Sequence, residues 1–376
     1  MLSPPLSITL TVTSVLALLF IVAYQGQDLG LRHAPFPHAQ QEPILAAFSR
    51  HRGPLPIPSR TFVISLLRRQ DRREDMERLR ARLNEAGDSM GEIQWSFVDA
   101  LEAASPLVSN ILASVRTLRT AVASKPEAIY GDREIKLPFS WPVEDESTTL
   151  NPTTFWTDTA RSLRHHTIHQ DSTPLTCATE NLTIPTYTPE LPEWKILSRN
   201  RIAVWHSHFS TVRLAESLNA REDEELETAT LILEDDVDME SDVRERLREM
   251  WPALPREWDI IFLGHCWSDE TLHAPIYVSS TSHTALHPSN APLCTHAYVL
   301  SPKGLRRLLW HLSHPPFSYS RAYDRAVAWL VQSGRMTGFS VVPSVVVQRK
   351  IGSSDVMSGT GSRWKDSLAD GILDRL

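Results

Sequence analysis

The stretch Arg60–Gly87, RTFVISLLRRQDRREDMERLRARLNEAG, joins two periodicities that decide the fold class. Its first part, Phe62–Leu66, is a short apolar run typical of a buried strand. The charged part that follows has helical spacing, because Met76, Leu79 and Leu83 share one face. A buried strand followed by an amphipathic helix is the first half of a βαβ unit.

A second strand is expected in Ile93–Ala100, IQWSFVDA, which completes that unit and favours a parallel sheet. The alternation continues further along the chain. Further strands are expected at residues 228–234, 258–264, 294–300 and 339–347, and further helices at 200–220, 242–251, 302–312 and 324–334. The sequence therefore predicts an α/β domain.

Residues 101–195 interrupt this pattern. A helix is expected at Ala104–Ala123, but Lys136–Glu193 is rich in Thr, Ser, Pro and His and has little periodicity. An irregular segment of that length inside a domain is usually functional or disordered. We interpret residues 101–195 as a long, poorly patterned insertion in the domain.

The composition limits the function classes. The chain has 376 residues, of which 41% are hydrophobic and 22% charged, as in ordinary globular proteins. A formal net charge of −7 argues against a general nucleic-acid binder, whose surface is basic. The three cysteines are too few for a disulfide framework and match no zinc-site spacing.

The N-terminus has the composition of a membrane segment. No charged side chain occurs in Met1–Gln27, and Leu6–Tyr24 is long enough to cross a bilayer as a helix. A signal peptide and a buried core helix are the alternatives, but the basic start of a signal peptide is missing. We expect a signal-anchor that makes the chain a single-pass type II membrane protein of the Golgi or ER.

This topology implies four segments. They are a cytoplasmic tail at 1–5, the transmembrane anchor at 6–24, a stem at 25–57 and a lumenal domain at 58–376. The sequon at Asn181 is compatible with a lumenal domain. A lumenal domain could form one disulfide, and Cys266–Cys294 is the favoured pair because Cys177 lies in irregular sequence.

Four acids follow the apolar run of TLILEDDVDME, Thr230–Glu240, at positions Glu234, Asp235, Asp236 and Asp238. Like charges this close repel one another, so solvation in a surface turn or a bound cation must offset the repulsion. Open α/β sheets bind ligands beyond the carboxyl ends of their strands, and carboxylates suit Mg²⁺, Ca²⁺ or Mn²⁺. A cation shared with a phosphate-bearing substrate is the favoured interpretation.

Three other templates do not fit the cluster. An EF-hand loop that began at Asp236 would need Gly and Glu where Ser241 and Leu247 stand. No P-loop motif occurs after an early strand. The D-x-D-x-[TV] pattern of haloacid-dehalogenase-type phosphatases is incomplete, because Glu240 occupies the last place.

Several motifs occur in the order seen in glycosyltransferase family 25. They are FVISLLRRQDRRE, WSFVDA, RIAVWHSHFSTVR, LILEDDVDME, WDIIFLG and THAYVLSPKGLRRLL. The chain resembles this family over Thr61–Ala100 and Asn200–Asp355, and it is most similar to the membrane-anchored fungal members. The family includes bacterial lipooligosaccharide and animal procollagen galactosyltransferases.

The resemblance implies a GT-A-like, Rossmann-related fold, with a mixed, mainly parallel sheet flanked by helices. It also implies a UDP-sugar donor, Mn²⁺ or another divalent cation, and inversion at the anomeric carbon. In the family's pattern Glu234, Asp235 and Asp236 replace the D-x-D motif, and the outer two acids face the donor ribose and the cation. Asp236 and Asp238 themselves form a D-x-D, so the register of the motif stays open by two residues.

Other candidate residues come from the resemblance and from the chemistry of transfer. The family's pattern places Ser207 and His208 in the donor site. Inversion by a single displacement needs a general base, for which Asp324 and then Asp355 are the candidates. Arg72, just after the first strand, could approach the diphosphate or the base of the donor. The structural alternatives are a solvated helix start for Arg72, a buried helix histidine for His208 and a helix N-terminal carboxylate for Asp324.

Histidines and tryptophans near expected strand ends have weaker functional signals. His265 and His296 could supply a further metal ligand, although a structural role is favoured for both. A core position is favoured over a sugar platform for all four tryptophans Trp205, Trp258, Trp267 and Trp310, and Trp267 is the best candidate among them to stack on a sugar.

The sequence thus predicts a metal-dependent hexosyltransferase. It would move a hexose, galactose by analogy with the family, from a UDP-sugar to a hydroxyl of a glycan or glycoprotein. Two alternatives stay open: a catalytically silent lumenal glycan-binding or scaffold relative, and a metal-dependent phosphohydrolase. Nucleic acid is not an expected partner.

Overall fold

A computed structural model describes residues 60–85, 92–141, 173–179, 182–220, 229–267, 270–349 and 368–373. The chain divides into two units, Met1–Phe48 and Ser49–Leu376, and every described residue lies in the second. The expected tail, anchor and stem, the sequon at Asn181 and the candidate base Asp355 all lie outside the described residues. No helix among the described residues is both long enough and apolar enough to cross a membrane.

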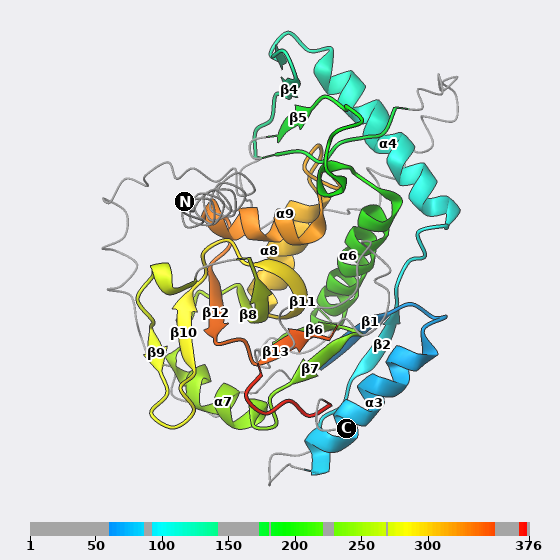
Figure 1. The fold of residues 1–376 in the computed structure, drawn as a ribbon. Coiled ribbons are helices and arrows are strands. Elements are labelled where there is room, and N and C mark those ends of the chain that lie inside the picture. The colour runs from blue at the N-terminus through cyan, green and yellow to red at the C-terminus, as the bar shows by residue number, and fades with distance from the viewer. Residues whose placement is uncertain are drawn as a thin grey trace, which may run out of the picture. The chain divides into compact units, whose positions relative to one another are not determined.

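An eight-stranded mixed sheet forms the centre of the domain (Figure 1). In spatial order its strands are β2 Ser96–Asp99, β1 Arg60–Ser65, β6 Thr230–Glu234, β11 Leu293–Leu300, β8 Ile260–Cys266, β12 Gly338–Val342, β10 Ala285–Pro288 and β9 Tyr277–Val278. β1 is parallel to β2 and β6, and β12 is parallel to β8. β11 is antiparallel to both β6 and β8, so β2, β1, β6, β8 and β12 all run in one direction.

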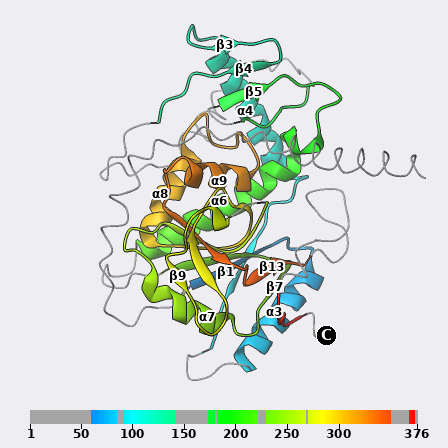
Figure 2. The ribbon, with the colours of Figure 1, turned by 60° about the vertical axis from the view of Figure 1, so that its left-hand side comes forward.

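Helices cover both faces of this sheet (Figures 1 and 2). The α-helices are α3 Gln70–Glu85, α4 Pro106–Ala123, α6 Arg199–Asn219, α7 Val243–Met250, α8 Pro302–Ser313 and α9 Tyr323–Gln332. Short 3-10 turns are η3 Glu193–Lys195, η4 Trp251–Ala253 and η5 Glu270–Leu272. The predicted α/β class, with a mixed sheet between helices, is confirmed.

Alternation along the strands divides the core between the two faces. In β1, Phe62 and Ile64 join the cluster under α4, α6, α8 and α9, whereas Val63 joins the cluster under α3 and α7. In β6, Ile232 and Leu233 divide in the same way. This period of two is what a strand buried on both sides requires, and it explains the near-continuous apolar runs in the sequence.

The helix predicted after β1 confirms the periodicity argument. The side chains of Met76, Leu79 and Leu83 are all buried on one face of α3. In α8 the expected N-cap also forms, because the Ser301 hydroxyl accepts the N–H of Gly304 at 2.9 Å and Pro302 takes the first helical position. Local sequence therefore sets the start of α8 and the buried face of α3.

The described part of residues 101–195 contains ordered structure. It holds α4, η3 and a small antiparallel sheet of β3 Ile129–Tyr130, β4 Glu134–Lys136 and β5 Thr183–Pro185. The helix expected at Ala104–Ala123 is confirmed as α4. The Arg119 guanidinium fastens this helix to the main body by donating to the carbonyls of Thr176 and Ser320 at 2.7 and 2.9 Å.

The apolar run at residues 339–347 forms two strands rather than one. It breaks at Pro343, after β12, and its second part becomes β13 Val346–Gln348. β13 pairs antiparallel with β7 Val237–Met239, which begins inside the acidic stretch. Proline has no N–H for the ladder, so the chain leaves the main sheet there and starts a second one.

The favoured cysteine pair forms the disulfide. Cys266 at the end of β8 bonds to Cys294 in β11, and Cys177 is a buried free thiol. Two antiparallel neighbours in the sheet are thereby linked at the edge where β8 ends.

Burial of a histidine in this core makes stability depend on pH. His311 on α8 is fully buried, and burial lowers its pKa from 6.5 to about 3. Below pH 6.5 the unfolded chain therefore binds a proton at this histidine that the folded chain does not bind. The free energy of unfolding falls as the pH drops from 6.5 toward 3. We expect His311→Phe to reduce the loss of unfolding free energy between pH 7.5 and 5 by about 2 kcal/mol.

Urea unfolding of both chains at the two pH values measures this difference. The exposed His283, changed to Asn, is the matched control, because asparagine tolerates the positive φ of 54° found there. Equal acid sensitivity of wild type and His311→Phe would contradict the prediction.

Candidate functional site

The acidic residues gather at one edge of the main sheet. β1, β6, β8 and β12 run in the same direction, so their carboxyl ends meet at this edge. Glu234 is the last residue of β6, and Asp235 and Asp236 form the turn into β7. The predicted position of the cluster, beyond the end of a buried strand, is confirmed, and this is where open α/β sheets bind ligands.

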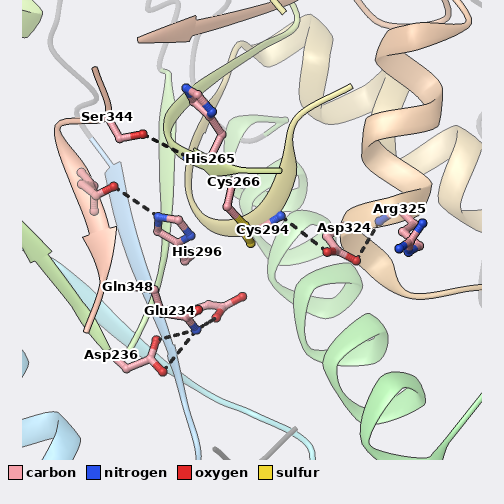
Figure 3. Close-up of a disulfide and its surroundings, with 11 residues drawn as sticks. Glu234, Asp236, His265, Cys266, Cys294, His296, Asp324, Arg325, Ser344 and Gln348 are labelled. Atoms are coloured by element: carbon pink, nitrogen blue, oxygen red, sulfur yellow. Dashed lines mark hydrogen bonds between the residues drawn. A yellow bond between two sulfur atoms is a disulfide. The ribbon is translucent and has the colours of Figure 1, made fainter. Parts of the chain in front are cut away.

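Glu234 and Asp236 face one another across the amide of Gln348 (Figure 3). The Gln348 Nε2 lies 3.4 Å from Glu234 Oε2 and 3.2 Å from Asp236 Oδ1. Burial, together with the nearby charge of Glu234, raises the pKa of Asp236 to about 7. The two carboxylates are therefore close enough that ionising one opposes ionising the other.

Arg72, in the first turn of α3, reaches across to the turn after β6. Its Nη1 lies 2.8 Å from Asp235 Oδ1 and 3.2 Å from Asp236 Oδ2, and all three side chains are largely buried. Burial opposes the charge of Arg72, but Asp236 and Asp235 outweigh it and raise the pKa of the guanidinium above its usual value. Arg72 therefore does not have the solvated position of an ordinary helix start, and its approach to a diphosphate stays a prediction.

The neighbouring arginines have other contacts. Arg68 pairs with Glu102, and Arg73 donates to Asp99. Arg69, just before α3, pairs with Asp71 in the first turn of that helix. Arg72 is thus the member of this basic group that carries positive charge to the acidic turn.

His208 connects Glu234 to the hydrophobic interior. Its Nε2 lies 3.4 Å from Glu234 Oε1, and its Nδ1 lies 3.0 Å from the Tyr298 hydroxyl. The Tyr298 hydroxyl continues the chain to the Tyr323 hydroxyl at 3.0 Å. Burial opposes ionisation of Glu234, but His208, His296 and Arg72 keep its pKa below the usual range. Glu234 therefore stays ionised next to a histidine that fixes its orientation.

The donor set around Gln348 fits a divalent cation. The two carboxylates offer hard oxygen ligands, and a cation between them would offset the repulsion that raises the pKa of Asp236. No group of three or more His, Cys, Asp or Glu side chains is placed to hold a metal in the part of the chain that the structure describes. Glu234 and Asp236 would therefore share the cation with water or substrate oxygens, as in sites where Mg²⁺ is held by one or two carboxylates.

Asp238 has a different environment. It is fully buried in β7, and its Oδ1 accepts the N–H of Met239 at 2.8 Å and that of Leu373 at 3.0 Å. These contacts fasten the segment 368–373 to the second sheet. Gln348 thus brings Glu234 together with Asp236, whereas the contacts of Asp238 are with backbone N–H groups.

The remaining candidates occupy distinct places. Ser207 is buried in α6, where its hydroxyl donates to Ala203 O at 2.8 Å and accepts the N–H of Leu101 at 2.9 Å. Asp324 lies in the first turn of α9, and its carboxylate accepts the N–H of Arg325 at 2.8 Å and that of Cys294 at 3.5 Å. In the view of Figure 3 the disulfide is drawn to the left of Asp324 and above the carboxylate pair.

The histidine and tryptophan candidates lie in different surroundings, and the expected core position is wrong for Trp267, whereas Trp258 and Trp310 are half-buried. His265 Nε2 and His296 Nε2 contact the carbonyls of Val341 and Val346, at 3.3 and 3.2 Å. Trp205 is fully buried in the core, as predicted. Trp267, next to the disulfide, is 64% exposed and has a positive φ of 58°.

Three polar residues of this site are absent from the sequence-based candidates. Gln348 is the polar residue that ends the apolar run 345–347. This change from apolar to polar residues was the one feature of the sequence that could have indicated it. Tyr298 and Tyr323 sit inside apolar stretches, where tyrosine is indistinguishable from core packing. Only the three-dimensional arrangement shows that their hydroxyls form a series of polar contacts that leads to His208 and, through it, to Glu234.

Arg72→Lys tests the geometry of the acidic turn. In the wild type one guanidinium nitrogen, Nη1, contacts both Asp235 and Asp236. A lysine ammonium is more strongly hydrated and sits on a stem of different length and shape, so it should not keep both contacts, and we expect the unfolding free energy to fall by about 1 kcal/mol. Arg82→Lys, at an exposed position of the same helix, should leave stability unchanged. Urea unfolding of the three chains measures the difference, and equal losses in both variants would show that the guanidinium has no special role here.

Comparison of this chain with protein-family models finds no matching family, and comparison with curated proteins finds no matching relative. The chemistry of the site therefore rests on the residues that form it. It offers two neighbouring carboxylates with oxygen donors for a cation, a buried guanidinium beside them, and a further carboxylate, Asp324, at the start of α9.

Proposed function

We propose that the protein is a metal-dependent, inverting glycosyltransferase. It would move a hexose, galactose by analogy with the family it resembles, from a UDP-sugar to a hydroxyl of a glycan or glycoprotein. The observation that carries the proposal is the pair Glu234 and Asp236, brought together by Gln348 where β6 ends in a mixed α/β sheet. The order of motifs that resembles glycosyltransferase family 25 supports the same activity.

In this proposal Glu234 and Asp236 hold the cation, and Asp235 holds Arg72 beside them. A bound divalent cation would neutralise charge on the departing nucleoside diphosphate. Arg72 adds a positive charge to the same side of the site and fixes the position of Asp236. His208 orients Glu234 through the contact between Nε2 and Oε1. Ser207 acts one step away, by holding Leu101 against α6.

Asp324 is the proposed general base, with Asp355 as the second candidate. A single displacement requires one carboxylate to take the proton of the acceptor hydroxyl. The N–H groups of Arg325 and Cys294 hold the Asp324 carboxylate at the start of α9. The link between Cys266 and Cys294 limits movement of that second donor. The proposal also includes the type II membrane topology, with the domain in the lumen of the Golgi or ER.

One assay tests the activity. The full-length chain in detergent is incubated with Mn²⁺ and a panel of UDP-, GDP- and CMP-sugars, and both hydrolysis and transfer to simple sugars are measured. We expect turnover of a UDP-hexose that disappears when EDTA removes the metal and returns when Mn²⁺ is added. Absence of any Mn²⁺-dependent binding of a nucleotide sugar would refute the proposal.

A parallel assay separates the other enzyme class. A metal-dependent phosphohydrolase would release phosphate from a simple phosphomonoester, which a glycosyltransferase leaves intact. Phosphate release that depends on Asp236 would replace the proposed function with hydrolysis.

A further inference from the structure

A pocket of about 720 Å³ lies apart from the acidic site. It is formed where the segment after β4 meets the second half of α9 and the residues that follow that helix. Figures 1 and 2 both show β4 and β5 beyond α9, on the side remote from β7 and β13. The volume is in the range of sites that bind small molecules or one or two sugar residues.

Aromatic rings form the walls of this pocket. Trp141 and Trp329 lie nearly parallel, with ring centroids 5.8 Å apart and an interplanar angle of 21°. Phe317 packs against both, with its centroid 5.1 Å from that of Trp141 and 5.8 Å from that of Trp329. Phe317 is almost fully buried, whereas both tryptophans keep part of their surface accessible. The walls are therefore broad, flat and packed from behind.

Two arginines lie against these rings. The Arg335 guanidinium is 4.5 Å from the Trp141 centroid and 5.8 Å from that of Trp329. Arg321 is 5.1 Å from the Phe317 centroid and is only 4% exposed. Stacking on aromatic faces limits the freedom of both guanidinium planes. The positive charges of Arg321 and Arg335 thus lie against the walls of the pocket and not only at its rim.

The charge balance of the pocket is opposite to that of the whole chain. Its lining includes three cationic side chains, of Lys136, Arg321 and Arg335, and one carboxylate, of Glu127. The chain as a whole has a formal net charge of −7. An anion is therefore attracted to this pocket more strongly than to the average surface.

We propose that this pocket binds an acidic sugar residue of a glycan. The apolar face of a pyranose ring would stack on Trp141 or Trp329, and its carboxylate or sulfate would accept hydrogen bonds from Arg335 and Arg321. Charge-assisted hydrogen bonds of that kind are about twice as strong as neutral ones, so an acidic sugar is preferred over a neutral one. The proposal does not rest on the proposed transferase activity, because none of these residues belongs to the acidic site.

The test compares two trisaccharides of equal length, trigalacturonic acid and galactotriose. Binding to the full-length chain in detergent is measured by ligand-observed saturation-transfer NMR and by calorimetry, without metal. We expect trigalacturonic acid to bind at least about tenfold more tightly than galactotriose. UDP should not displace it, because the donor belongs to the acidic site.

Variants assign the binding to the pocket. Arg335→Gln should weaken trigalacturonic acid about tenfold and leave galactotriose unchanged. Lys136→Glu, at an exposed rim position, should weaken it in the same direction and does not disturb the core. Arg248→Gln, on the exposed face of α7, is the control and should have no effect.

Three outcomes would overturn the proposal. They are equal or undetectable binding of the two trisaccharides, displacement of trigalacturonic acid by UDP, and unchanged binding in both pocket variants. If Arg335→Gln fails to fold, Lys136→Glu alone decides, because its side chain lies on the surface.

Discussion

Asp236→Asn is expected to lower the rate of sugar transfer by about a thousandfold, because it removes one of two carboxylates proposed to hold the cation. The substitution keeps the shape of the side chain and its place beside Gln348. The Km for Mn²⁺ should rise as well, since Glu234 alone would hold the metal. Initial rates over a range of Mn²⁺ concentrations separate the two effects.

The same substitution should not destabilise the metal-free protein. The pKa of Asp236 is raised to about 7 from an ordinary value of 3.8, so the folded state favours the protonated form. The stability from this group is therefore present below pH 3.8 and is lost as the pH rises through 7. At pH 8 folding of the wild-type chain includes the unfavourable free energy of ionising Asp236 in its buried site. Asparagine does not ionise, so the variant lacks this cost. We expect the unfolding free energy of Asp236→Asn at pH 8 to equal or exceed that of the wild type.

These two readouts together make the test specific. Loss of activity with unchanged or higher stability is typical of a group kept for function at a cost to folding. Normal turnover in Asp236→Asn would show that the metal is not held at this turn. Loss of both activity and folded structure would mean that Asp236 has a structural role instead.

Much of the fold could be predicted from local sequence patterns. The βαβ opening follows from the change of period between Phe62 and Leu83, and the start of α8 follows from Ser301 and Pro302. Patterns of this kind report which face of each element is buried, and the core confirms them. They do not report strand order, which depends on contacts between distant segments such as β11 between β6 and β8.

The candidate site could be predicted only in part for the same reason. The acids after β6 were visible because four charges directly follow an apolar run. Gln348 was not, because it reaches the site through the pairing of β13 with β7, more than a hundred residues away in the chain. The register of the D-x-D motif was also undecided by sequence, since Asp236 belongs to two overlapping motifs, one with Glu234 and one with Asp238. The surroundings of each carboxylate, and not their spacing, distinguish them.

Asp238→Ala provides the strongest test of that distinction, with an expected loss of about 4 kcal/mol in the free energy of unfolding. Asp238 Oδ1 accepts two buried N–H groups, of Met239 and Leu373, and alanine would leave both without that acceptor. Asp238→Asn is the matched control, because its amide oxygen can still accept both bonds and the loss should be much smaller. Urea unfolding of the three chains measures these differences.

The activity of the Asp238 variants decides the register independently of stability. If Glu234 and Asp236 hold the cation, folded Asp238→Asn should keep the Mn²⁺ dependence of the wild type. If Asp236 and Asp238 held it, Asp238→Asn would raise the Km for Mn²⁺ as strongly as Asp236→Asn does. Because Asp238 is fully buried and bonded to the segment 368–373, we expect the first result. Its side chain then anchors the C-terminal segment. The acidic stretch would divide into a functional part that ends at Asp236 and a structural part that begins in β7.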